Sequence, residues 1–194
     1  MKKYINIGFL ILTLFALPVT VSKVHADTFK IDPEYTTVSF RIRHIMGYQA
    51  GVFKKYDGTI QVNGKNGALE SIEANVEVDS LNTYHEARDK DLRSEKFFDA
   101  AKFPQAKFVS KSISPDKIKG DLTLHGVTKE VDFDYEFFGV AMDQRGRTKV
   151  FLSLGAEINR KDFGITYNTK TDDGRMLLGD SVELRIDVQG VLEK

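Results

Sequence analysis

Most of the chain alternates between apolar and polar positions with a period of two residues, as expected for β-strands with one dry face. In Thr37–His44, for example, Val38, Phe40 and Ile42 share one face and polar residues share the other. Eight strands are predicted from such runs: Thr37–His44, Val52–Asn63, Ile72–Val78, Lys107–Ile113, Lys117–Leu124, Lys129–Val140, Thr148–Ile158 and Val182–Val188.

The connections between these runs are mostly short turns. Asn63-Gly64 and His125-Gly126 are typical turn pairs, and Gly47–Gly51 is interpreted as a loop. Spacings long enough for strand–helix–strand crossovers are absent from the sequence, so the sheet is predicted to be antiparallel. The fold class is therefore all-β, an eight-stranded antiparallel barrel in one domain of residues 27–194, with a two-sheet sandwich as the alternative.

One stretch, Ser80–Asp99, favours a helix. Thr83 followed by Glu86 has the spacing of a capping box, which would start the helix at about residue 83 and carry it to about 96. We expect this helix to close or flank one end of the barrel.

The dry face includes small residues in phase with larger ones, namely Gly58, Ala74, Gly120, Ala156 and Gly190. They either leave room for an elongated apolar tunnel or mark the bulges and corners that a barrel needs. If a tunnel is present, its predicted lining is Phe40, Ile42, Tyr56, Ile60, Ala74, Val76, Leu92, Phe97, Leu122, Phe133, Tyr135, Leu184 and Ile186.

Several charged residues on the helix are candidates for binding a ligand headgroup. Arg88 and Arg93 are candidates for a phosphate or other oxyanion, because a guanidinium group offers a matched fork of donors. Asp89 is a further candidate, but Asp89 and Arg93 are four residues apart and also fit an ordinary surface ion pair.

Three more candidates lie outside the helix. His44 is in phase with the dry face of its strand, so it either makes a structural hydrogen bond or contacts ligand. Arg160 and Asp162 follow the Thr148–Ile158 strand and either pair with each other or complete the tunnel mouth.

Residues 1–26 have the three-part pattern of a secretory signal peptide. Lys2 and Lys3 precede the apolar run Ile5–Val19, and small residues lead up to cleavage after Ala26. The apolar run is shorter than the roughly 20 residues that a spanning helix needs. We therefore expect a periplasmic or secreted protein without stable membrane insertion.

Composition excludes several functions. The chain has no cysteine, which excludes disulfides and thiolate chemistry. Cleavage would remove three lysines and no acid, leaving 25 basic and 28 acidic residues, without the basic field that nucleic acid requires. The mature histidines, His44, His85 and His125, have no metal-site spacing, and no GxSxG motif is present. No cofactor, metal or catalytic residue is therefore predicted, and a homodimer is left open.

Four motifs in order resemble the YceI-like polyisoprenoid-binding family of secreted bacterial proteins. The matching segments are Val38–Phe40 with His44 and Gly51–Phe53; Ser80, Thr83, Arg88-Asp89, Leu92–Ser94 and Phe97–Asp99; Gly120–Lys129; and Asn159-Arg160, Asp162–Gly164, Leu178–Asp180 and Val182. The resemblance covers essentially all of residues 27–194.

The resemblance implies a lipocalin-like barrel whose tunnel binds an isoprenoid or similar amphiphile, without catalysis. Tyr35-Thr36 stands where family members often have His-Ser, and Asp91 where they often have His. These departures remove potential cations, so a quinone, fatty acid or fatty amide stays open beside a pyrophosphate. The alternatives are a stress-related protein-interaction module with a filled core and, third, an enzyme that uses Arg88, Asp89 and His44 on a lipid phosphate.

Overall fold

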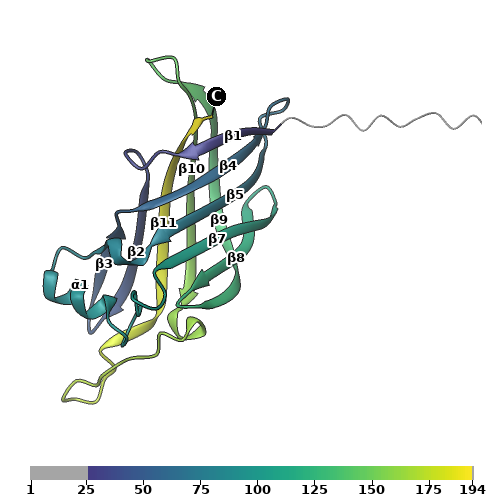
Figure 1. The fold of residues 1–194 in the computed structure, drawn as a ribbon. Helices are drawn as coiled ribbons and strands as arrows, with labels where there is room; N and C mark the ends of the chain where they lie inside the picture. Colours follow the sequence, from purple (N-terminus) through teal and green to yellow (C-terminus); the bar gives the residue numbers. More distant parts are fainter. Residues whose placement is uncertain (1–25, 194) are drawn as a thin grey trace, which may run out of the picture.

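The structure, a computed structural model, describes residues 26–193 and consists mainly of β-strands (Figure 1). The predicted signal peptide therefore lies almost entirely outside the described residues. The strands are β1 (Ala26–Ile31), β2 (Thr37–His44), β3 (Gly47–Phe53), β4 (Tyr56–Asn63), β5 (Leu69–Glu77), β6 (Leu81–Asn82), β7 (Gln105–Ile113), β8 (Lys117–Leu124), β9 (Val127–Met142), β10 (Thr148–Asn159) and β11 (Leu178–Leu192). The helical elements are α1 (Glu86–Arg93) and the 3-10 turns η1 (Val78–Ser80) and η2 (Arg160–Phe163).

Eight of these strands close into an antiparallel barrel, as predicted. Their order around the ring is β1, β4, β5, β7, β8, β9, β10 and β11. The ring closes because β1 pairs with both β4 and β11, for example through Phe29 opposite Ile60 and opposite Leu192. The remaining strands β2, β3 and β6 continue from the other end of β11.

The number of ring strands is correct, but their membership differs from the prediction. β1 was not predicted, and it takes the place in the ring that the pattern gave to Thr37–His44. The predicted strand Val52–Asn63 is two strands, because the chain passes from β3 to β4 at Lys54-Lys55.

The interpretation of Gly47–Gly51 as a loop is wrong. These residues belong to β3 and pair with β2 through a hairpin, with Gly47 opposite His44 and Gly51 opposite Phe40. The segment has no regular apolar alternation, and its strand conformation comes from pairing rather than from its own side chains.

The helix is shorter than predicted and starts differently. α1 begins after His85, whose side-chain Nδ1 accepts a hydrogen bond from the Arg88 amide at 3.3 Å. The predicted capping box is wrong, because the amide and hydroxyl of Thr83 both donate to the carboxylate of Asp89. Tyr84, with φ of 62°, interrupts the chain between Thr83 and the helix.

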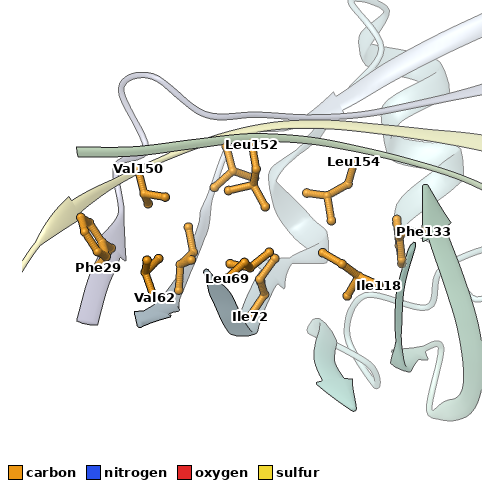
Figure 2. Close-up of a cluster of buried hydrophobic side chains, with 11 residues drawn as sticks. Phe29, Val62, Leu69, Ile72, Ile118, Phe133, Val150, Leu152 and Leu154 are labelled. Atoms are coloured by element: carbon orange, nitrogen blue, oxygen red, sulfur yellow. The ribbon is translucent and has the colours of Figure 1, made fainter. Parts of the chain in front are cut away.

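One end of the barrel has a solid apolar core (Figure 2). Figure 2 shows Val150, Leu152 and Leu154 of β10 facing side chains from the strands across the barrel. The buried cluster is Phe29, Ile60, Val62, Leu69, Ile72, Ile118, Phe133, Val150, Leu152, Leu154 and Val188. Within residues 26–193, no helix is long and apolar enough to cross a membrane.

Candidate functional site: an apolar cavity at the helix end of the barrel

The other part of the barrel interior encloses a cavity of about 210 Å³. Its surface is almost entirely apolar, because most of the inward residues of the strands have aliphatic or aromatic side chains. Ile72, Phe133, Leu154 and Val188 belong both to the solid core and to the cavity wall, so they form the floor of the cavity. The interior is therefore neither filled throughout, as an interaction module with a filled core requires, nor open along its whole length.

Eleven of the thirteen predicted tunnel residues line this cavity: Phe40, Ile42, Tyr56, Ala74, Val76, Leu92, Phe97, Leu122, Phe133, Leu184 and Ile186. The other two do not. Ile60 is fully buried in the solid core, and the Tyr135 hydroxyl donates to the carbonyl of Ser114 at 2.9 Å. The predicted tunnel is thus a shorter pocket, closed by the core.

The glycines on the dry face do not create this space. A Cβ at Gly190 would lie 2.9 Å from Val150, and one at Gly120 would lie 2.6 Å from the ring of Phe108. A Cβ at Gly58 would lie 2.8 Å from the backbone of Ala74. These glycines allow close packing, and of the five small residues only Ala74 lines the cavity.

Two segments lie across the end of the barrel remote from the solid core. Leu92 and Phe97 come from α1 and the turn after it, and Ile165 comes from the loop after η2. The segments meet where the rings of Phe97 and Tyr167 pack edge to face, with centroids 5.0 Å apart. In Figure 1, α1 and this loop lie at the same end of the barrel. The helix therefore flanks the cavity end, as predicted.

Arg160 is a buried charged residue in the cavity wall, with 4% of its surface exposed. Its Nε donates to the Gly179 carbonyl at 2.9 Å, and Nη1 donates to the carbonyls of Ile165 and Tyr167 at 2.7 and 2.8 Å. Nη2 lies 3.4 Å from the carboxylate of Asp180. Burial lowers the pKa of Arg160, against the opposing effect of the Asp180 charge.

The charged candidates on the helix, Arg88, Asp89 and Arg93, make contacts within the chain and do not line the cavity. Arg88 donates to the Thr83 hydroxyl at 2.7 Å and to the Thr83 carbonyl at 2.8 Å. Arg93 donates to the carbonyls of Asp79 and Leu81 and lies 3.3 Å from the Asp79 carboxylate. Arg93 therefore makes its ion pair with Asp79, and not the surface ion pair with Asp89 that the spacing of four residues would allow.

Asp89 is buried, with 5% of its surface exposed. Burial by itself would raise the pKa of its carboxyl. The two hydrogen bonds from Thr83 and the charges of Arg93 and Arg88 outweigh this effect, and they hold the pKa below its ordinary value. These contacts give Asp89 a structural position beside the cavity end.

The last two candidates also lie outside the cavity wall. His44 is half-buried at the end of β2, opposite Gly47. Asp162 lies in η2, and the ion pair of Arg160 is made with Asp180, so of the two alternatives left open for Arg160 and Asp162, pairing with each other is not what the structure has. Whether any of the six polar candidates binds a headgroup stays a prediction.

Several lining residues were not predicted, including Phe53, Phe98, Phe108, Leu124, Ile165 and Leu178. Leu124 lies in a strand whose alternation already placed it on the dry face, whereas the residues in phase with Phe108 are Ser110 and Ser112, so alternation did not mark Phe108 as inward. Ile165 and Leu178 lie at the two ends of a long loop, where no periodic pattern marks the residues that fold inward.

Fold and site together define a lipocalin-like antiparallel barrel with an internal apolar cavity. The chain belongs to the family of proteins with a YceI-like domain, whose family model matches residues 29–190. It is 39% identical to "Protein YceI" of Salmonella arizonae and to that of Salmonella dublin, over the full length of both chains in each case.

Solved structures show the same fold. The YceI protein of Campylobacter jejuni is 27% identical, with a TM-score of 0.64 over the whole of both chains. BcnA of Burkholderia cenocepacia is 21% identical, with a TM-score of 0.68 over 82% of this chain and 98% of its own. A polyisoprenoid-binding domain from Saccharophagus degradans is 13% identical, with a TM-score of 0.63 over 87% of this chain and all of its own.

Proposed function

We propose that this protein binds, stores or transports a long-chain amphiphile, an isoprenoid, isoprenoid quinone or fatty-acyl compound, without catalysis. The carrying observation is the cavity inside the barrel, whose wall is almost entirely apolar. Family membership and the polyisoprenoid-binding neighbour support a lipid as the ligand. Burial of its chain would contribute roughly 25 cal/mol per Å² of apolar surface, reduced by the cost of ordering ligand and protein.

Of the six polar candidates only Arg160 lines the cavity, so it is the one best placed for an anionic or strongly polar headgroup. It is buried in the wall and near the end that Phe97 and Ile165 line. Arg160, Arg88 and Arg93 all donate to oxygens of the chain, so a role at a headgroup requires that these contacts exchange. A leader at residues 1–26 would place the carrier in the periplasm or outside the cell.

Native mass spectrometry of the purified mature protein, with lipid extraction, tests this function. We expect an amphiphile to copurify, or to bind when fatty acids or isoprenols are added. An Ala74→Phe variant fills the cavity and should lose this binding. The matched control Ala50→Phe changes an exposed residue of β3 and should keep it. Absence of bound chain from the wild-type protein under all these conditions would contradict the proposal.

A further inference from the structure

We infer that the floor of the cavity sets the length of chain that this protein accepts, at about sixteen carbons within the barrel. The inference rests on the proposed function and goes beyond it by defining the ligand's buried portion. Ile72, Phe133, Leu154 and Val188 are the residues that set the limit.

The length follows from the strand that runs along the cavity. The residues of β11 that line it extend from Leu178 to Val188. The steps from Leu178 to Val182 lie opposite only the two steps of β2 from His44 to Ile42, so the lining spans about eight regular steps. Eight steps cover about 26 Å along a strand, and a barrel tilt of about 40° reduces this to about 20 Å along the axis. An extended alkyl chain advances about 1.3 Å per carbon, given C–C bonds of about 1.5 Å. The cavity therefore holds a chain of about sixteen carbons.

The floor cannot move aside easily, because close-packed side chains lie behind it. Leu152 and Ile118 lie in the core next to Leu154 and Phe133, and both are at most 1% exposed (Figure 2). The ring of Phe133 also packs edge to face on Phe108, with centroids 5.0 Å apart. Interiors of this density do not admit further methylene groups without strain. A longer isoprenoid or acyl chain would therefore leave its remaining carbons at the cavity end near α1.

A chain-length series tests the inference. Affinities of the mature protein for saturated fatty acids of increasing length, and for a matching series of linear isoprenols, are measured by calorimetry below the concentrations at which the probes aggregate. We expect each added carbon to tighten binding by about fourfold until the chain reaches the floor. Beyond about sixteen carbons the affinity should stop rising with chain length, and the chain length at this break is the quantity to compare among variants.

Two variants should move the break in opposite directions. Leu154→Ala opens the floor and should shift the break by roughly three carbons to longer chains, the number of carbons that the substitution removes. Ala74→Leu adds three side-chain carbons beside the floor and should shift the break by roughly three carbons to shorter chains. Leu152→Ala is the matched control, because Leu152 lies behind the floor and does not line the cavity. Its break should stay at the wild-type length.

The outcomes separate this inference from the proposed function. An affinity that keeps rising well past sixteen carbons, or a break that neither variant moves, would overturn the inference about the floor and leave the carrier function intact. Failure of every probe to bind the wild-type protein would overturn both. If Leu154→Ala fails to fold, Ala74→Leu still decides the question.

Discussion

At the scale of single residues, Asp89 shows how a charged side chain organises the turn before the helix. Its carboxylate accepts from the amide and the hydroxyl of Thr83, and the same hydroxyl accepts from Arg88. The buried carboxylate thus satisfies donors that would otherwise have no partner. A buried group in such a network stabilises the fold most when all of its hydrogen bonds are made.

Replacement of Asp89 should lower the free energy of unfolding. Asp89→Ala leaves the Thr83 amide and hydroxyl without their acceptor, and we expect a loss of about 1–3 kcal/mol. Urea denaturation measures this loss in the free energy of unfolding. The measurement is made at about pH 7, within the pH range where proteins are usually most stable. Asp91→Asn changes an exposed acid of the same helix and should shift the midpoint little. An equal loss in both variants would contradict a special role for Asp89.

The lowered pKa of Asp89 also predicts a pH dependence. Because the carboxyl has a lower pKa in the folded chain than its ordinary 3.8, its contribution is present above that value. The contribution is lost as the pH falls through the folded-state pKa. Asp89→Asn, which cannot ionise, should therefore lose less stability than the wild-type protein between about pH 5 and about pH 2. Identical losses in the two proteins would show that Asp89 does not drive the acid sensitivity.

At the scale of elements, Arg160 holds the long loop between η2 and β11 against the barrel. Its guanidinium group bonds to carbonyls at both ends of this loop, those of Ile165 and Gly179. The His125 ring makes a further contact near the start of this loop, where its Nδ1 lies 3.1 Å from the carbonyl oxygen of Phe163. Because Ile165 and Leu178 line the cavity, the position of the loop determines the shape of the cavity end.

Arg160→Ala should loosen this loop more than the barrel. The three carbonyls lose a buried donor, so we expect faster amide hydrogen exchange at Ile165–Leu178 and a stability loss of about 1–3 kcal/mol. Hydrogen exchange read by mass spectrometry measures the first effect. Lys161→Ala removes an exposed ion pair with Asp180 and should leave the exchange of the loop nearly unchanged. Unchanged exchange in Arg160→Ala would contradict the role assigned to its guanidinium.

At the scale of the whole molecule, the barrel divides into a solid part and a hollow part. Tight packing around Leu152 and Val150 stabilises one end, and the space between Phe40, Leu122 and Leu184 leaves the other end able to hold a chain. The long strands β10 and β11 run through both parts, so the solid end supports the walls of the hollow one.

This division predicts unequal costs for the same substitution. Leu152→Ala empties a close-packed site and should lower the free energy of unfolding by about 2–5 kcal/mol. Leu122→Ala enlarges an existing cavity, where fewer packing contacts are lost, and should cost less than Leu152→Ala. Chemical denaturation of the ligand-free variants gives both values. A larger loss for Leu122→Ala would contradict the division into a solid part and a hollow part.

The alternation of residues in β2, β10 and β11 by itself determined that the fold is an antiparallel sheet with apolar residues inside, and left a two-sheet sandwich open beside the barrel. Period-two patterning fixes which face of a strand is dry, because a shift of one residue exposes every apolar side chain. It also placed most of the cavity wall, from Phe40 to Ile186. The motifs around Arg88 and Arg160 identified the family, although the contacts of these arginines could not be read from their spacing.

Only the tertiary structure decided which inward positions are filled and which are empty. Ile60 and Ile42 have the same pattern in sequence, yet one lies in the core and the other lines the cavity. The difference depends on what crosses the barrel at each level: Phe29 and Val150 pack near Ile60, whereas the space near Ile42 is bounded by α1 and the loop after η2. Packing among strands distant in the chain carries no local signal, and for this reason the floor of the cavity became visible only in three dimensions.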